Sequence, residues 1–212
     1  MKDIIIYGAG GFGREVNVLI KQINSVKEAY NVLGFVDDNP EILNKNVNGL
    51  KVLGGIEYLL TFDKPVVVAV AIITKSKETI VNRLLQNKNL IFTNLIHPQI
   101  YWDDTNVIGS GNILCHGMNI TCNVVIGDFN LFNGKVGLGH DVNIGSYNLF
   151  GPNSFIAGEV TIANNNTFSM NSSVIQQKKI GSYNVINLNS VVIRNIKDNG
   201  TYFGVPALKQ KF

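Results

Sequence analysis

One histidine in the chain is followed directly by an acid, His140-Asp141, within a stretch rich in glycine, asparagine and aliphatic residues. Histidine exchanges a proton near neutral pH, and a carboxylate bound to its far ring nitrogen fixes the tautomer and raises its basicity. Such a pair can take the proton from an amine or a hydroxyl that attacks a carbonyl carbon. Taken alone, an exposed His-Asp pair is more often an ordinary surface feature, so its meaning depends on its surroundings.

A glycine-rich stretch near the N-terminus is a second place where chemistry is expected. Gly8–Gly13, GAGGFG, fits the pattern G-x-G-x-x-G between an apolar run and a helical pattern. Glycines let backbone N–H groups approach a phosphate, and the start of a helix favours negative charge. Asp37, at the end of the next expected strand, stands about where a ribose-binding acid would lie. We expect a mononucleotide such as UDP rather than NAD, since there is room for little more than one mononucleotide half. The alternative is that these glycines only form a tight turn.

The remaining histidines and the cysteines do not indicate a metal site. His97, His116 and His140 stand too far apart in the sequence to resemble the close pairs of metal ligands. Cys115 and Cys122 fit no metal pattern and are too few for a disulfide framework. We therefore expect no metal.

Residues 1–95 alternate between short apolar runs and helical patterns. This alternation predicts a small Rossmann-like α/β domain with a parallel sheet over residues 1–95. The expected strands are Ile4–Tyr7, Val32–Val36, Pro65–Val70 and Ile91–Leu95, and the expected helices are Arg14–Ile23 and Lys75–Gln86.

From Ile96 to Val192 every sixth residue is apolar, and all 17 positions keep the same register. A six-residue repeat predicts a parallel β-helix over residues 96–197, in which each hexad gives one short strand and one tight turn. Three hexads would make one triangular coil, so residues three hexads apart would stack. Residues 198–212 would leave the coil and cap its end.

Composition narrows the classes of function. A hydrophobic content of 45% with 16% charged residues indicates a packed globular protein. The net charge of +3 is not clustered, so no binding to nucleic acid is expected. No segment approaches about 18 uninterrupted apolar residues, and the N-terminus lacks a signal peptide, so we expect no membrane span and a cytoplasmic location.

Taken together, these motifs resemble one family over essentially the whole chain. The marks are IIIYGAGGFGRE at the start, FVDD at Phe35–Asp38, NLIHP at Asn94–Pro98, the hexads, GHDVNIG at Gly139–Gly145 and GVPA at Gly204–Ala207. The chain resembles the sialic acid O-acetyltransferase type of left-handed β-helix (hexapeptide repeat) sugar acetyltransferases, which includes the N-acetyltransferases of UDP-4-amino-sugars.

The resemblance implies a homotrimer of left-handed β-helices. The N-terminal domain would hold a nucleotide-linked amino-sugar, and acetyl-CoA would lie between two adjacent β-helices. The implied activity is acetyl-CoA-dependent N-acetylation of the sugar amine in bacterial glycan biosynthesis. O-acetylation of a sialic acid or another glycan hydroxyl is the nearest alternative; a zinc-dependent hydratase and a non-enzymatic scaffold are the more distant ones.

The resemblance also assigns roles to residues. His140 would be the general base and Asp141 its orienting acid, with the backbone N–H of Gly158 at the acetyl-CoA thioester. Met170 would contact the pantetheine arm, and Asn133 the sugar near the reacting centre. The nucleotide-sugar would be lined by Gly10, Gly11, Phe12, Asp37 and Asp38.

The chain departs from the family pattern at several positions. Ala71 and Leu149 replace a frequent glycine and a frequent histidine, and Asp141 is one methylene shorter than the frequent glutamate. Lys209 and Lys211, near the C-terminus, would either neutralise phosphates of CoA or belong to a solvated tail.

Overall fold

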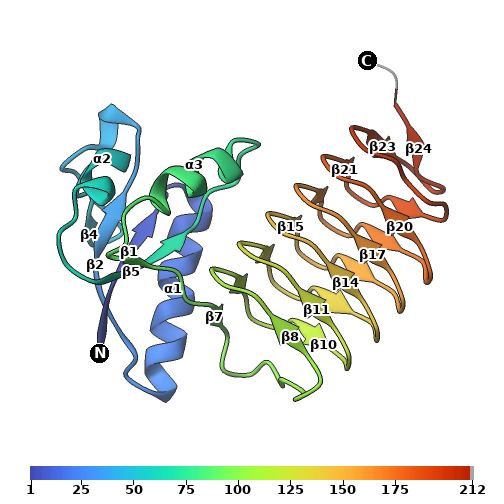
Figure 1. Cartoon of the computed structure of the whole chain (residues 1–212), viewed down its shortest axis with the longest axis horizontal. Coiled ribbons are helices and arrows are strands. Elements are labelled where there is room, and N and C mark those ends of the chain that lie inside the picture. Colours follow the sequence, from blue (N-terminus) through green and yellow to red (C-terminus); the bar gives the residue numbers. More distant parts are fainter. Residues whose placement is uncertain (211–212) are drawn as a thin grey trace. The chain divides into compact units, whose positions relative to one another are not determined.

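The structure is a computed structural model that describes residues 1–210 (Figure 1). The chain divides into two compact units, Met1–Leu95 and the part from Ile96 onward. Each unit has its own core, and each is described by itself below.

The first unit is built on a four-stranded parallel sheet with the strand order β2-β1-β5-β6. Its central strands are β1 (Lys2–Tyr7) and β5 (Val66–Val70). β5 is wholly apolar and buried and β1 is buried from Ile4 to Tyr7, as expected for parallel strands covered on both faces. The outer strands are β2 (Tyr30–Val36) and β6 (Leu90–Ile91).

Helix α1 (Gly11–Val26) buries its apolar face, including Val16 and Ile20, and begins earlier than the predicted start at Arg14. The last residues of the glycine-rich stretch therefore form its first turn. Two shorter helices and a two-stranded hairpin complete the unit. They are α2 (Ile56–Leu60), α3 (Lys77–Leu84), β3 (Asn46–Val47) and β4 (Leu50–Lys51), with a single 3₁₀ turn, η1 (Pro40–Ile42).

The predicted strand Ile91–Leu95 is wrong. The chain forms two short strands there, β6 and β7 (Leu95–Ile96), and β7 pairs within a sheet of the second unit. The stretch is thus shared between two sheets, which its composition alone does not reveal.

The second unit is a parallel β-helix with three faces (Figure 1). Each strand pairs in parallel with the strand three hexads further on, as in Val125 with Asn143. The first face holds β10 (Asn119–Ile120), β13 (Gly137–Leu138), β16 (Phe155–Ile156), β19 (Ser173–Val174) and β22 (Val191–Val192). The second holds β8 (Val107–Ile108), β11 (Val125–Ile126), β14 (Asn143–Ile144), β17 (Thr161–Ile162) and β20 (Lys179–Ile180). The third holds β7, β9 (Ile113–Leu114), β12 (Leu131–Phe132), β15 (Leu149–Phe150), β18 (Thr167–Phe168), β21 (Val185–Ile186), β23 (Thr201–Phe203) and β24 (Leu208–Lys209).

The hexad residues form the core of the coil, as predicted. From Leu114 to Val192 each is at most 6% exposed, whereas Ile96, Trp102 and Ile108 at the first coil are only partly buried. On one face three phenylalanines, Phe132, Phe150 and Phe168, stack with ring centroids 4.7 and 4.9 Å apart.

One corner of the coil is held by a column of buried asparagines. The Oδ1 atom of each accepts a hydrogen bond from a backbone N–H one coil further on, as from Asn166 to Asn148 at 2.8 Å. The column consists of Asn112, Asn130, Asn148, Asn166 and Asn184. These bonds satisfy backbone groups that the tight turns leave unpaired inside the coil.

From Gly111 to Asn189, each corner turns through one residue in the left-handed region. From Asn123 to Asn189 the φ angle of every sixth residue lies between 53° and 63°. Asn and Asp tolerate this region better than other residues with side chains. Asp141 occupies this place in its hexad, so the turn makes it and its predecessor, His140, project from a corner.

The register shortens at the C-terminal end, where Ile196 pairs with Ile180 and not with Lys178, which a full coil would place opposite it. Strands β23 and β24 then close the coil as an antiparallel pair. Within residues 1–210, no helix has the length and apolar character needed to cross a bilayer.

Candidate functional site

His140 and Asp141 lie at the corner between β13 and β14, with their side chains 56% and 48% exposed. The Nδ1 atom of His140 lies 2.7 Å from Oδ2 of Asp141. This hydrogen bond, and a second one from Asn123, lower the pKa of Asp141 below its ordinary value. An ionised carboxylate can only accept, so Nδ1 carries the proton of this bond, and in the neutral ring Nε2 has the lone pair. The predicted pair therefore has the tautomer of a general base.

Gly158, one coil further on, faces this ring. A Cβ atom on Gly158 would lie 2.7 Å from both Nε2 and Cε1 of His140, so the imidazole fits only because that position has no side chain. Gly158 is buried, and its N–H donates to no acceptor in residues 1–210. A Cβ on Gly139 would lie 2.6 Å from the nitrogen of Gly158, so a second glycine keeps that nitrogen uncrowded. The corner thus combines a proton acceptor with a free backbone donor.

Asn123 is a site residue that the sequence analysis missed. Its Nδ2 donates to Oδ1 of Asp141 at 3.0 Å. The signal was present in the sequence, because Asn123 and Asp141 stand three hexads apart, at the same place in successive coils, and such positions stack.

Asn133 and Met170 lie on the corner that follows the third face, after β12 and β18. The side-chain oxygen of Asn133 accepts from the N–H of Gly134 at 2.7 Å, and the carbonyl of Met170 accepts from Asn189 at 3.1 Å. Within the described chain no interaction joins either residue to His140. Their predicted roles, contact with the sugar and with pantetheine, stay predictions.

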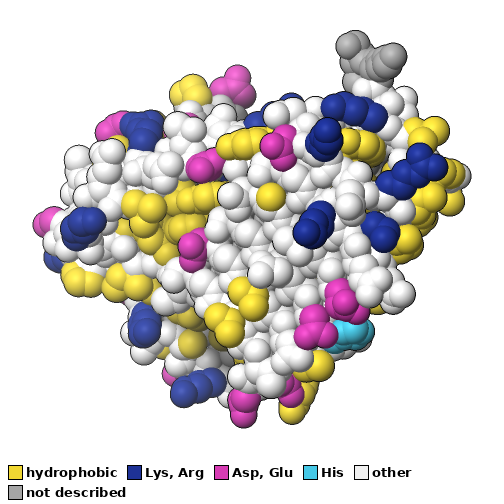
Figure 2. All heavy atoms as spheres, turned by 45° about the vertical axis from the view of Figure 1, so that its right-hand side comes forward, with side chains coloured by type: hydrophobic (Ala, Val, Ile, Leu, Met, Phe, Trp, Pro, Cys, Tyr) yellow, Lys and Arg dark blue, Asp and Glu magenta, His cyan; other side chains and the backbone are white. Residues whose placement is uncertain are grey.

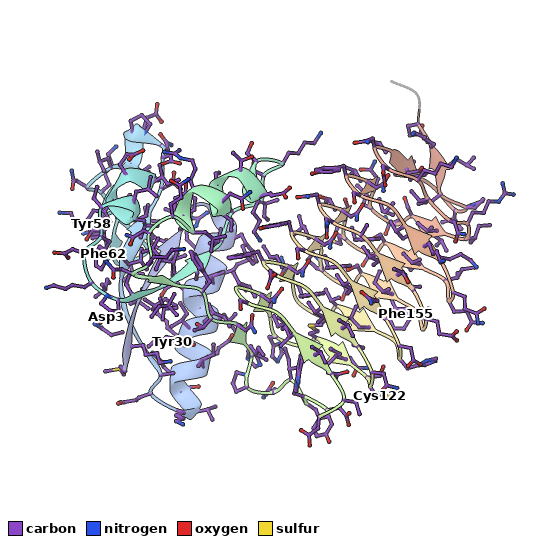
Figure 3. The ribbon with its side chains drawn as sticks, viewed as in Figure 1. Asp3, Tyr30, Tyr58, Phe62, Cys122 and Phe155 are labelled. Carbon is purple, nitrogen blue, oxygen red and sulfur yellow. The ribbon has the colours of Figure 1, made fainter. Side chains whose placement is uncertain are left out.

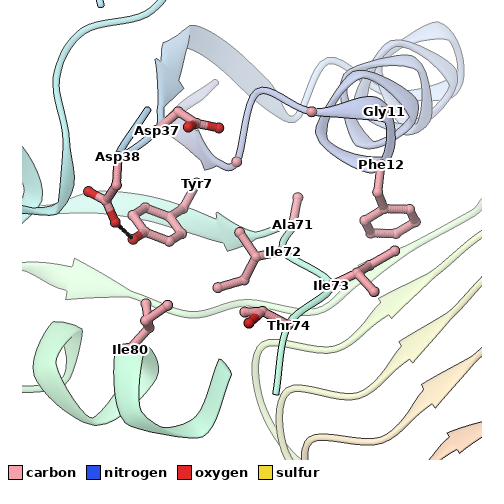
Figure 4. Close-up of a pocket in the computed structure, with 12 residues that line it drawn as sticks. Tyr7, Gly11, Phe12, Asp37, Asp38, Ala71, Ile72, Ile73, Thr74 and Ile80 are labelled. Carbon is pink, nitrogen blue, oxygen red and sulfur yellow. Dashed lines mark hydrogen bonds between the residues drawn. The ribbon is translucent and has the colours of Figure 1, made fainter. Parts of the chain in front are cut away.

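The first unit contains a cavity of about 410 Å³ beside the glycine-rich turn (Figure 4). It brings together all five residues predicted to line the nucleotide-sugar. The cavity is lined by Tyr7, Gly8, Gly10, Gly11, Phe12, Asp37, Asp38, Ala71, Ile72, Ile73, Thr74 and Ile80.

The glycines of this turn fall into two groups. Gly8 has a φ of +108°, and a Cβ there would lie 2.7 Å from the carbonyl oxygen of Ala71. A Cβ on Gly13 would overlap the carbonyl of Gly8. A tight strand-to-helix turn explains these two. Gly10 has no atom near its missing side chain, and Gly11 has only the end of Arg14 at 3.9 Å. Their backbone faces open space at the start of the long helix α1, where an anion would be favoured.

The two acidic residues of the cavity are already hydrogen-bonded within the unit. Asp37 accepts from the N–H of Ala9 at 2.8 Å and so ties the end of β2 to the glycine turn. Asp38 accepts from the hydroxyl of Tyr7 at 2.5 Å and from the N–H of Ile56 at 2.6 Å. Burial, together with the Asp38 carboxylate, raises the pKa of Tyr7 above its ordinary value. Both acids shape the cavity as well as line it.

The other two histidines form a separate pair. His97 is 4% exposed, and its Nδ1 accepts from the N–H of Gln99 at 3.2 Å. Its ring meets that of His116 edge-on at 4.6 Å, and the Nε2 atom of His116 lies 2.9 Å from Oε1 of Gln99. Across residues 1–210 no group of three or more His, Cys, Asp or Glu side chains could hold a metal ion.

Comparison with known proteins gives one family match and many structural matches. Residues 3–84 match the model of the PglD N-terminal domain. The whole chain superimposes on perosamine N-acetyltransferase from Caulobacter crescentus, a variant in complex with CoA and GDP-perosamine. The TM-score is 0.87 and the identity 24%, over 100% of this chain and 98% of that one.

Two further structures are similar over the full length. The acetyltransferase domain of PglB from Neisseria gonorrhoeae, in complex with acetyl coenzyme A, matches with a TM-score of 0.88 and 21% identity, over 99% of each chain. WeeI from Acinetobacter baumannii matches with a TM-score of 0.80 and 24% identity, over 99% of this chain and 100% of that one. No curated protein matches in sequence.

These findings confirm the predicted fold class. The chain is a small α/β domain with a parallel sheet followed by a left-handed parallel β-helix of hexapeptide repeats. The family resemblance seen in the sequence thus agrees with the family model for the first unit and with the fold of the whole chain.

Proposed function

We propose that the protein is an acetyl-CoA-dependent N-acetyltransferase that acts on the amino group of a nucleotide-linked sugar. The observation that carries this proposal is the corner at His140. There an imidazole oriented by Asp141 lies beside the missing side chain of Gly158, a residue whose backbone N–H is unpaired within residues 1–210. Full-length similarity to structures that hold CoA with GDP-perosamine, or acetyl coenzyme A, supports the same reading.

The geometry suits acyl transfer from a thioester to an amine. As the amine nitrogen attacks the thioester carbonyl, Nε2 of His140 takes the amine proton, and Asp141 stabilises the imidazolium through Nδ1. The N–H of Gly158 donates to the oxygen of the tetrahedral intermediate. The C–S bond then breaks, and the imidazolium returns its proton to the departing thiolate of CoA.

The nucleotide-sugar would bind in the cavity of the first unit. Gly10 and Gly11 would leave the backbone of the turn accessible to the diphosphate, with Phe12 lining the cavity beside them, and the start of α1 supplies favourable partial charge. Asp37 and Asp38 would contact the base or the ribose with the lone pairs that remain on their oxygens.

Acetyl-CoA would lie along the β-helix, with its thioester at Gly158 and its pantetheine arm at Met170. Exposed cations gather toward the C-terminal end of the β-helix on the face shown in Figure 2. The C-terminal coils carry the exposed residues Lys179, Arg194, Lys197 and Lys209. These charges suit the phosphates of CoA. Lys211, which was predicted to join them, lies outside the described residues. We further propose a homotrimer in the cytoplasm; sedimentation of the purified protein tests the trimer.

A panel of nucleotide-linked amino-sugars with acetyl-CoA tests the activity. GDP-, UDP- and dTDP-linked 4-amino-sugars would be screened for release of free thiol and for an acetylated product by mass spectrometry. We expect turnover on at least one of them. We also expect His140→Ala to lower kcat by about a hundredfold or more, since general bases contribute roughly 10²–10⁴. Acetylation of sugar hydroxyls alone would replace the proposal by O-acetylation, and full activity of His140→Ala would remove His140 from the reaction.

A further inference from the structure

The carboxylate of Asp141 is bound on both of its oxygens. Oδ2 accepts from His140 at 2.7 Å, and Oδ1 accepts from Nδ2 of Asn123 at 3.0 Å. Asn123 follows Cys122 at the corner between β10 and β11, one coil before Asp141 (Figure 3). Three side chains therefore form one chain of hydrogen bonds, Asn123 to Asp141 to His140.

The hydrogen bond from Asn123 matters because the His140–Asp141 pair is exposed to solvent. About half of each side chain, His140 and Asp141, is exposed, and an exposed pair of this kind gains little from its own attraction. A carboxylate held at only one oxygen can rotate about its side-chain bonds and carry the imidazole with it. Bonds at both oxygens fix the plane of the carboxylate, and with it the direction of the Nδ1–H bond.

Asn123 is itself held from the coil before it. Its N–H donates to Oγ1 of Thr105 at 2.9 Å, and that hydroxyl donates to Oδ1 of Asp103 at 2.5 Å. Asn123 and Asp141 share the left-handed backbone, with φ of 56° and 58°. Because the two backbones have the same conformation one coil apart, their side chains leave the corner in the same direction and meet.

We propose that Asn123 is a positioning residue for acetyl transfer. It fixes the Asp141 carboxylate, and through it the His140 ring, so that Nε2 faces the reacting amine. This role rests on the proposed function, and it adds a residue to the machinery that neither the sequence motifs nor the resemblance assigned.

An amide suits this position better than a charged group. It donates to Asp141 without adding charge beside a carboxylate that must remain ionised. A second carboxylate already stands one coil further on, at Glu159, where Nε2 of Gln177 donates to it at 3.2 and 3.4 Å. An acid at position 123 would place Asp141 between two like charges.

Asn123→Gly is the cleanest test, since glycine keeps the left-handed backbone without cost and removes only the amide. We expect kcat to fall roughly three- to tenfold, the factor of one hydrogen bond, while KM for both substrates stays within about twofold. The kcat of Asn123→Asp should fall further. The matched control is Asn189→Gly, which removes another left-handed asparagine and its bond with Asn171, and should retain wild-type kcat.

Carboxyl NMR titration of Asp141 gives a readout that does not depend on turnover. Because Asn123 contributes to the lowered pKa of Asp141, we expect that pKa to rise in Asn123→Gly and to stay unchanged in Asn189→Gly. An active wild type with an unaltered kcat and an unaltered titration in Asn123→Gly overturns the positioning role alone. A wild type that transfers no acetyl group to any substrate overturns the proposed function, and the positioning role with it.

Discussion

At the scale of the residue, the imidazole of His140 is defined by neighbours from three successive coils. Asn123 precedes it, Asp141 adjoins it, and Gly158 follows it. The stacking of the coils brings these residues together, so a change in any one of them acts on the position of one ring.

Gly158→Ala should displace that ring. The new methyl group would stand 2.7 Å from Nε2, and no real Cβ contact is so short, so the imidazole must move or the coil must distort. We expect kcat to fall by roughly ten- to a hundredfold, because small errors in the placement of a catalytic group are costly. Steady-state kinetics at a temperature well below the melting point would measure this.

Gly145→Ala is the matched control. A Cβ there would overlap Oδ1 of Asn164, so this variant suffers a similar clash, but at the corner after β14. It should lose stability and retain kcat. Equal rates for Gly158→Ala and the wild type would show that the ring does not depend on this glycine.

How much of the site was visible in the sequence differs from residue to residue. His140 and Asp141 were found because a His-Asp pair has a chemistry of its own. Asn123 was missed because an asparagine in a turn is common, and its partner lies three hexads away in the sequence. Gly158 was assigned only by resemblance, since nothing in the sequence shows that a glycine faces a ring from the previous coil.

At the scale of the element, the buried asparagine column predicts a large loss of stability from a small change. Asn148→Ala removes the acceptor of the buried Asn166 N–H and the donor to the partly buried carbonyl of Ala163, and leaves both groups without these partners. We expect a loss of about 2–4 kcal/mol, since each stranded group costs about 1–3 kcal/mol. The midpoint of urea unfolding would measure it.

Asn143→Ala controls for the loss of an asparagine from the same coil. Asn143 lies on β14 and is exposed. This variant should unfold within about 0.5 kcal/mol of the wild type, as is usual for surface changes. If Asn148→Ala and Asn143→Ala have the same midpoint of urea unfolding, the buried asparagine column stabilises the fold no more than an exposed asparagine does.

His97 makes the first coil sensitive to acid. Burial, and then the neighbouring charge of His116, lower its pKa below the ordinary 6.5. Below about pH 6.5 the unfolded chain therefore binds more protons than the folded one, so stability is full above that pH and falls as the pH drops through it. Urea midpoints between about pH 5 and 8 should show this decline, and His97→Asn should flatten it. An identical decline in His97→Asn would assign the effect to other groups.

The elements themselves were predictable to different degrees. The hexads fixed the β-helix because one apolar residue in six admits few other structures. Helix α1 and the central strands followed from strong local patterns. Helix α2 and the hairpin of β3 and β4 were missed because they are too short to show a period. The predicted strand Ile91–Leu95 was wrong because its two ends pair in different sheets.

At the scale of the whole molecule, the two units divide the proposed work. The α/β unit offers a cavity with an open glycine turn, and the β-helix offers a base with a backbone donor. The sequence indicated this division through its change of period near residue 95, the boundary between the two compact units of the structure. The residues that line the cavity and the His140 corner meet through contacts between distant parts of the sequence. The spacing of apolar residues does not reveal these contacts.

Because residues three hexads apart stack, the number of residues between two positions decides whether they lie on the same face of the β-helix. If the hexad Asn143–Asn148 were duplicated in place, every sixth residue would still be apolar, and circular dichroism should still report the β structure of the β-helix. Every later residue, however, would be rotated by a third of a revolution. Pro152 would then stand over the His140 ring in place of Gly158, and proline has no N–H to offer.

The control is an insertion of three hexads beyond the site, made by duplicating Val160–Gln177. It is added after Gly158, so Gly158 stays over the His140 ring, and its full revolution keeps the later residues in phase. The shorter insertion should therefore abolish transfer while the longer one preserves it. A β-helix of this kind keeps its later residues in phase only when it grows by whole coils. Equal loss of transfer from both insertions would show that lengthening the β-helix, and not the displacement of Gly158, abolishes transfer.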